Sequence, residues 1–265
     1  MPDGFVDIHC HLLPGIDDGA ADWETTLGMA QLAVADGIQT IIATPHQLGN
    51  FAHNQGNTIR ARTLELQQFL DEHGISLRVL PGGDVRIEET MIQQLVCGEV
   101  MSLGDLRRHV LLELPHELYF PLESVLAALE HEGMAGILSH PERNQGLLRE
   151  PGLLPRLVDV GCLMQVTAGT LMGTFGSHAQ QLAEWMLAEG LVHFIATDAH
   201  GTRARRPLMR RAYDRVAELT DAQTAADLCC RHPALVARGE KVPAGRRLRP
   251  RSNGWRRLFS KNKVA

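Results

Sequence analysis

The chain has 265 residues, of which 44% are hydrophobic, and a net charge of −5. This length suits one large α/β domain, and the apolar content is ample for a packed core. The charge is uneven, because residues 245–265 contain six Arg, two Lys and no acidic residue, which leaves the rest of the chain near −13. An acidic body excludes a surface that coats nucleic acid, and the basic tail stands apart from it.

The sequence also predicts a soluble, cytoplasmic protein. It has no run of eighteen apolar residues, and its first ten residues have neither the basic start nor the apolar stretch of a signal peptide. The five cysteines form an odd set without a C-x-x-C pair, which argues against a disulfide framework and a zinc ribbon. They are Cys10, Cys97, Cys162, Cys229 and Cys230.

Seven short apolar or β-branched runs alternate with segments of helical periodicity. The predicted strands are 5–10, 39–44, 77–82, 109–114, 135–139, 163–167 and 192–197. The predicted helices are 22–37, 58–74, 121–133 and 177–190, with two more over 203–219 and 221–239. Repeated strand-helix units favour a parallel sheet, either closed into a barrel or open and doubly wound. A barrel is preferred, because no glycine-rich phosphate motif follows the first strand.

Six of these seven predicted strands have polar residues at their carboxyl ends. These ends form the edge of the sheet at which α/β proteins place their functional sites. The polar residues are His9 and His11, His46, Asp84, Glu113, His140 with Arg143, and Asp198 with His200. Only the strand that ends at Thr167 brings no His, Asp or Glu. His9 and His11 share one strand face, whereas Cys10 points to the other and is expected to be core.

These residues, with Asp18 from the loop after the first strand, are more ligands than one ion can hold. A buried carboxylate such as Glu113 in "VLLELP" is costly unless a metal or another charge compensates it. Imidazole and carboxylate together suit two or three ions of the Mn, Fe or Zn type. The sequence therefore predicts a multinuclear metal cluster.

The stretches "DIHCHLLPGIDDGA", "ATPH", "SHPERN" and "TDAH…RP" resemble the PHP (polymerase and histidinol phosphatase) superfamily. Within it they are similar to the bacterial manganese-dependent protein-tyrosine phosphatases of capsule and exopolysaccharide operons. The resemblance implies a distorted seven-stranded (β/α)7 TIM-like barrel in a single domain over 1–244, followed by a basic tail over 245–265 that is expected to be flexible.

The resemblance also implies a division of the ligands among three ions, most often Mn²⁺. His9, His11, Asp84 and Asp198 would hold one ion, and Asp84, Glu113 and His140 a second. Asp18, His46 and His200 would hold the third. The chain departs from the family at the bridging residue, where Asp84 stands in place of the usual, longer Glu.

The activity implied is hydrolysis of phosphotyrosine on the tail of a bacterial tyrosine autokinase. Arg143 and Arg206 resemble the two arginines that grip the phosphate, a role that suits a guanidinium fork. His200, His46 or a water could protonate the leaving group. A cysteine-based mechanism is excluded, because no arginine lies six residues after any of the five cysteines.

Three other functions remain open at this point. The first is a small-molecule phosphatase of the same superfamily, such as one for histidinol phosphate. The second is an amidohydrolase, which would typically need a metal-bridging lysine, but the three lysines all come late in the chain. The third is a scaffold without activity. The basic tail has two interpretations, a weak anchor for an anionic membrane or an acidic kinase tail, or a solubilising end. The oligomeric state is left open.

Overall fold

The computed structural model describes residues 4–243, which contain nine strands in two all-parallel sheets. The first sheet has the order β1 (Phe5–Cys10), β2 (Ile38–Ala43) and β4 (Arg78–Pro81). The second has the order β3, β5, β6, β7, β8 and β9. Its strands are His46–Gln47, Asp84–Arg86, His109–Glu113, Ala135–Ser139, Leu163–Thr167 and Phe194–Ala196. The predicted α/β class with parallel strands is confirmed.

The described chain has nine strands and not the seven predicted. Two residues separate each of the two extra strands, β3 and β5, from the end of the preceding strand, β2 or β4. The breaks fall at Thr44–Pro45 and at Gly82–Gly83. Proline cannot donate to a strand ladder, and glycine weakens a strand, so local pairing stops there. The two sheets also meet after β9, where the Asp198 N–H donates to the His9 carbonyl at 2.7 Å and Cys10 bridges to Ala199.

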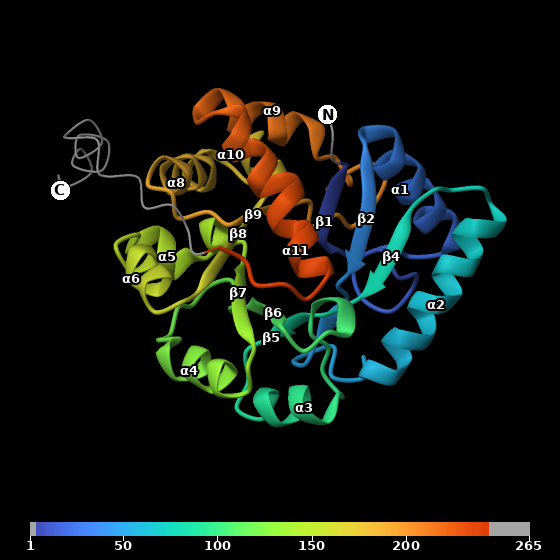
Figure 1. Cartoon of the computed structure of the whole chain (residues 1–265), viewed down its shortest axis with the longest axis horizontal. Helices are drawn as coiled ribbons and strands as arrows, with labels where there is room; N and C mark the ends of the chain where they lie inside the picture. The colour runs from blue at the N-terminus through green and yellow to red at the C-terminus, as the bar shows by residue number, and fades with distance from the viewer. Residues whose placement is uncertain (1–3, 244–265) are drawn as a thin grey trace.

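Helices surround these strands (Figure 1). The longer ones are α1 (Trp23–Asp36), α2 (Gly56–Glu72), α4 (Glu123–His131), α8 (Ser177–Ala188) and α9 (Arg210–Leu219). The four helices predicted between strands are therefore confirmed to within a few residues. The shorter helices are α3 (Met91–Cys97), α5 (Gln145–Arg149), α6 (Leu153–Asp159), α7 (Ala168–Leu171), α10 (Ala222–Ala226) and α11 (His232–Ala237).

The core has two parts, which explains why the strands are apolar on both faces. The larger cluster fills the space between strands and outer helices. The smaller one collects side chains from strands of both sheets and includes Val236 of α11. Its strand members are Val6, Ile8, Ile42, Leu111, Ile137, Leu163, Phe194 and Ala196. All six residues of β1 are buried, as expected for a strand covered on both faces.

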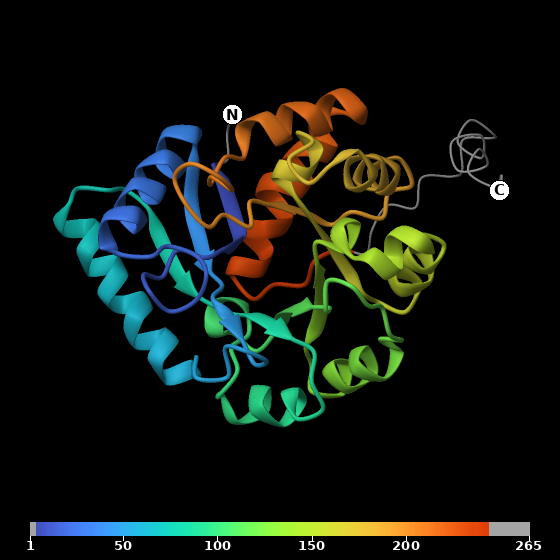
Figure 2. The same cartoon turned by 180° about the vertical axis from the view of Figure 1, so that it is seen from behind.

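The helix α11 and the loop between β1 and α1 lie on opposite sides of the strands. α11 crosses the near side in Figure 1, whereas the loop, drawn in blue, crosses the near side in Figure 2. That loop carries Asp17 and Asp18, so the candidate site lies on the side away from α11. No helix between residues 4 and 243 is long and apolar enough to cross a membrane. The predicted basic tail, 245–265, lies outside the described residues.

Candidate metal centre

The nine residues predicted as metal ligands come together where the strands end. Each of them lies within 4 Å of at least one other, measured between ring nitrogens and carboxylate oxygens. They group into four overlapping sets whose ligand atoms all lie within 4.8 Å of one another. These sets are His11–Asp18–His46–His200, His9–His11–Asp84, His9–His140–Asp198 and His46–Asp84–Glu113. Motifs that are far apart in the sequence thus contribute their side chains to one compact cluster.

Asp18 lies at the open side of this cluster. Its Oδ1 is 3.4 Å from Nε2 of both His46 and His200. The side chain is 57% exposed, in contrast to Asp84, which is fully buried. The His200 Nδ1 lies 3.0 Å from the carbonyl of Asp198, so this nitrogen is placed to donate and the Nε2 lone pair faces the cluster. Asp18, His46 and His200 are the three residues that the resemblance implied for a third ion, and His11 lies with them in the structure.

Asp84 supports the presence of a bound cation most directly. Neither of its carboxylate oxygens has a hydrogen-bond partner among the described residues, although the side chain is fully buried. Its Oδ2 is 3.5 Å from His9 Nε2 and 3.4 Å from His46 Nδ1. A buried carboxylate without donors is costly, and a divalent cation would compensate it. The donor set therefore fits metal ions, with Asp84 between two of the sets.

Asp198 turns its two carboxylate oxygens to different partners. Oδ1 faces the histidines, at 3.2 Å from His9 Nε2 and 3.5 Å from His11 Nε2. Oδ2 pairs with Arg143 and, at 2.6 Å, with Nη2 of Arg205. One carboxylate thus joins the ligand cluster to a pair of guanidinium groups.

The second predicted arginine does not lie in this arrangement. Arg206 is exposed and forms none of the described contacts with the cluster, whereas its neighbour Arg205 is half-buried and lines the cavity beside it. Successive residues of a loop point in different directions, so the sequence located the arginine segment but not the residue. Arg143 follows the strand 135–139 at the edge of the site, as predicted, and it contacts Asp198.

Two partners of the histidines were not predicted as site residues. The Asp17 carboxylate lies 2.7 Å from His11 Nδ1, and the side-chain oxygen of Gln165 lies 2.8 Å from His9 Nδ1. Both contacts leave Nε2 of the histidine directed to the cluster, the usual way in which a second residue orients a ligand. Gln165 comes from β8, so the strand that brought no candidate ligand supports one instead. Asp17 had a signal, because it adjoins Asp18 in "IDDG".

Charges in the cluster compensate one another. Although burial lowers the pKa of His11, its contact with Asp17 raises that pKa to about 10. Burial raises the pKa of Asp84 and Asp198, but the facing histidines, His9 first, bring both pKa values well below the usual range. A protonated His11 thus compensates the facing carboxylates, and a bound cation would replace its proton.

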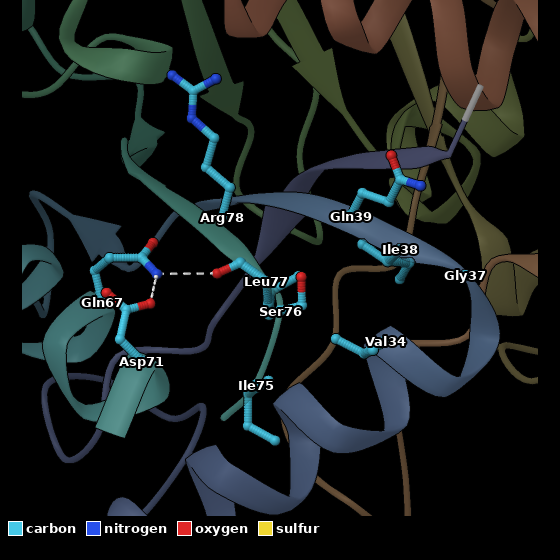
Figure 3. Close-up of a pocket in the computed structure, with 10 residues that line it drawn as sticks. All are labelled: Val34, Gly37, Ile38, Gln39, Gln67, Asp71, Ile75, Ser76, Leu77 and Arg78. Atoms are coloured by element: carbon cyan, nitrogen blue, oxygen red, sulfur yellow. Dashed lines mark hydrogen bonds between the residues drawn. The ribbon is translucent and has the colours of Figure 1, made fainter. Parts of the chain in front are cut away.

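A cavity of about 230 Å³ opens onto this cluster. It is lined by Asp18, His46, Glu113, Leu114, His116, Ser139, His140, Arg143, Asn144, Asp198 and Arg205. A larger hollow of about 610 Å³ lies near the opposite ends of β2 and β4, beside the last turns of α1 and α2 (Figure 3). Its lining has one acid, Asp71, and no histidine or cysteine, so it offers no ligand set for a metal.

Comparison with known proteins places the chain in a family. The model of the family "Capsular polysaccharide synthesis, CpsB/CapC" matches residues 5–238. The chain belongs to this family. That confirms the resemblance to the phosphatases of capsule operons.

The relatives are named as phosphatases. Tyrosine-protein phosphatase YwqE of Bacillus subtilis is 37% identical over 202 residues, covering 76% of this chain and 79% of the relative. Tyrosine-protein phosphatase CpsB of Streptococcus pneumoniae is 25% identical over 237 residues, covering 87% and 97%. A structure from a study of these two, described as unique metal-dependent tyrosine phosphatases, matches with a TM-score of 0.85 at 31% identity, covering 92% of this chain and all of the other. The predicted class of enzyme, a metal-dependent tyrosine phosphatase, is confirmed.

Proposed function

We propose that this chain hydrolyses phosphotyrosine on a bacterial tyrosine autokinase and so regulates capsular or exopolysaccharide synthesis. The proposal rests above all on the cavity in which a nine-residue ligand cluster meets two guanidinium groups. The names of the relatives support the choice of phosphotyrosine. We place the reaction in the cytoplasm. None of the five cysteines of the described chain forms a disulfide, which suits such a reducing compartment.

The ligands would hold two or three divalent cations, for which we propose Mn²⁺ ahead of Fe and Zn. His9, His11, Asp84 and Asp198 would hold one ion, Asp84, Glu113 and His140 another, and Asp18, His46 and His200 the third. Such ions supply a nucleophile from water at neutral pH and neutralise charge on phosphoryl oxygens. The orphaned oxygens of Asp84 support its assignment as the residue shared between ions, despite its being shorter than Glu.

The protein's own groups would bind and orient the phosphate. Arg143 and Arg205 lie beside the cluster, and guanidinium N–H groups are the donors suited to phosphoryl oxygens. The Nε of Arg205 is buried without a hydrogen-bond partner among the described residues, which leaves a donor for an incoming oxygen. His200, which the sequence offered both as a ligand and as a catalytic group, is better suited to be a ligand, because its Nδ1 is fixed by a carbonyl.

We further propose that the strands form the seven-stranded (β/α)7 barrel of the PHP fold, in a single domain over 1–244. Taking β2 with β3 and β4 with β5 gives seven strands in sequence order. The bridge between Cys10 and Ala199, which joins β1 to the end of β9, supports closure. The shared inner cluster of apolar side chains from both sheets supports it too.

The test is metal-dependent turnover on competing substrates. The protein is stripped with a chelator, reloaded with Mn²⁺, Zn²⁺ or Mg²⁺, and assayed on a phosphotyrosyl peptide, a phosphoseryl peptide and histidinol phosphate. We expect Mn²⁺ to restore activity that is selective for phosphotyrosine. Activity on histidinol phosphate alone would assign the same site to a small metabolite. Full activity after chelation, lost on thiol alkylation, would contradict the mechanism.

A further inference from the structure

Phe175 contacts both arginines of the site. The Cζ atom of Arg143 lies 4.3 Å from the centre of the Phe175 ring, and that of Arg205 lies 6.0 Å from it. Both distances fall within the range at which a cation is attracted to an aromatic face. Phe175 is half-buried, between α7 and α8, and nothing in its sequence context suggested a role in the site.

The strand order explains how one ring reaches both arginines. β8 lies between β7 and β9 in the sheet. Arg143 follows β7, Arg205 follows β9, and Phe175 belongs to the segment that follows β8. The aromatic ring therefore comes from the middle connection, and the two cations come from the connections on either side.

The two guanidinium groups need such a partner, because like charges repel at short range. Both contact the same carboxylate oxygen, Oδ2 of Asp198, which supplies a single negative charge. The negative face of the Phe175 ring is a second attraction, and it adds no hydrogen-bond acceptor that would compete with a phosphate. Pairing through a ring thus leaves N–H donors available to a ligand.

The segment that carries Phe175 is fixed by its own hydrogen bonds. The Thr174 N–H donates to the Gly169 carbonyl at 3.1 Å, and the Gly176 N–H donates to the Gly173 carbonyl at 3.1 Å. Gly173 and Gly176 have φ values of 79° and 89°, which favour glycine. Thr170 of α7 donates its hydroxyl to the buried Glu142 carboxylate, one residue before Arg143. The turn that carries Phe175 and the segment that carries Arg143 are therefore linked through the hydrogen bond between Thr170 and Glu142.

We propose that Phe175 is a positioning residue that holds Arg143 and Arg205 together as one clamp for the phosphoryl group. The inference deepens the proposed function and rests on its assignment of the two arginines to phosphate. It predicts that loss of the ring weakens phosphate binding without disturbing the metal cluster, which Phe175 does not contact in any described interaction.

The test measures inhibition by inorganic phosphate in Mn²⁺-loaded enzyme for Phe175→Leu, Phe175→Tyr and the matched control Phe69→Leu. Phe69 contacts Trp23 and His73 in its own aromatic cluster. We expect Phe175→Leu to raise the inhibition constant roughly three- to tenfold, the range of a partly buried cation–π contact. Phe175→Tyr keeps a ring and should stay within about twofold of the wild type, as should Phe69→Leu. Metal content should remain unchanged in all three variants.

A double-mutant comparison separates positioning from general packing. Since Arg143 is the nearer cation, the effect of Phe175→Leu should largely disappear in an Arg143→Gln background, which removes the charge, and persist in part with Arg205→Gln. Phosphate inhibition equal to wild type in Phe175→Leu, or a matching loss of metal, would overturn the inference while leaving the proposed function intact. If Arg143→Gln and Arg205→Gln also bind phosphate normally, the assignment of the arginines fails as well.

Discussion

Asp17 shows how much of the metal centre depends on a residue that offers no ligand atom to the ions. Its carboxylate meets His11 Nδ1 and also accepts the backbone N–H of Gly19 and of His46. It thereby orients the ring of His11 and fixes the backbone of His46, both of which are candidate ligands. Residues with this role are often as important to a metal site as the ligands themselves.

Replacing Asp17 by Asn should lower metal affinity about 10- to 100-fold, the usual effect of losing such a partner. The amide keeps the shape and one acceptor for the loop, but it no longer provides a carboxylate for His11. Calorimetric titration of the stripped protein with Mn²⁺ measures the change directly. Asp71→Asn, at the distant hollow, is the matched control and should bind like the wild type. Unchanged affinity in Asp17→Asn would show that His11 is oriented by other contacts.

At the scale of single residues, the sequence predicted which chemical groups come together in the site. It did not always predict which of two adjacent residues of the same type makes a given contact. The His-x-His spacing and the strand-end positions were sufficient to collect eight of the nine candidate ligands in one place, and Asp18 was added from the loop after the first strand. Asp17 and Asp18 are chemically identical, as are Arg205 and Arg206. Their different contacts depend on the direction that each takes from its loop, and spacing carries no information about that direction. Phe175 lacked even a chemical signal.

Among the elements, the ends of α1 were predicted from local signals, whereas the backbone just beyond β7 and β9 was not. The α1 helix begins after Asp22, whose side chain accepts the Thr25 N–H at 2.8 Å, and it ends at Gly37, which has a φ of 100°. Both signals are local and could be taken from the sequence. In contrast, His140 and Asp198 have φ values of 34° and 50°, which are uncommon for residues other than glycine. Tertiary contacts of the site impose that backbone, so no local pattern predicts it.

The cap of α1 gives a prediction about stability alone. Asp22→Ala leaves the first-turn N–H groups without their acceptor and should lower the free energy of unfolding by about 1 kcal/mol. Asp22→Asn keeps an acceptor and should lose much less. Urea denaturation of the metal-free proteins measures both, and Mn²⁺ binding should be unaffected. Equal losses in the two variants would mean that the charge of Asp22, and not its cap, stabilises the helix.

Over the whole molecule, the alternation of strands and helices was sufficient to predict a parallel α/β fold, since each helix must bury an apolar face on the sheet. The breaks that produce β3 and β5 were not predicted. They arise where strand ends turn towards the site, at Pro45 and at the Gly82–Gly83 pair, and His46 and Asp84 follow immediately. The same interruptions that change the strand count place two candidate ligands side by side, with their Cα positions paired in the sheet.

Two buried histidines away from the metal centre couple the fold to pH. Burial lowers the pKa of His193 to about 4, with His232 adding to the shift, and burial together with Arg108 lowers the pKa of His109 to about 4. Both are neutral in the folded protein, while in the unfolded chain each takes up a proton below about pH 6.5. Their contribution is therefore fully present above about pH 6.5 and is lost as the pH falls towards 4.

His193→Gln should make the free energy of unfolding less steep in pH over that window, by up to about 1.4 kcal/mol per pH unit. The His193 ring accepts the Met164 N–H at 3.1 Å, and the Gln side chain retains an acceptor for it. Urea denaturation of the stripped protein between pH 4 and 7 gives the slopes, and His178→Gln, at an exposed position, should match the wild type. The prediction concerns the slope of the free energy of unfolding against pH. A loss of stability that is the same at every pH would show that His193 acts through packing and not through its proton.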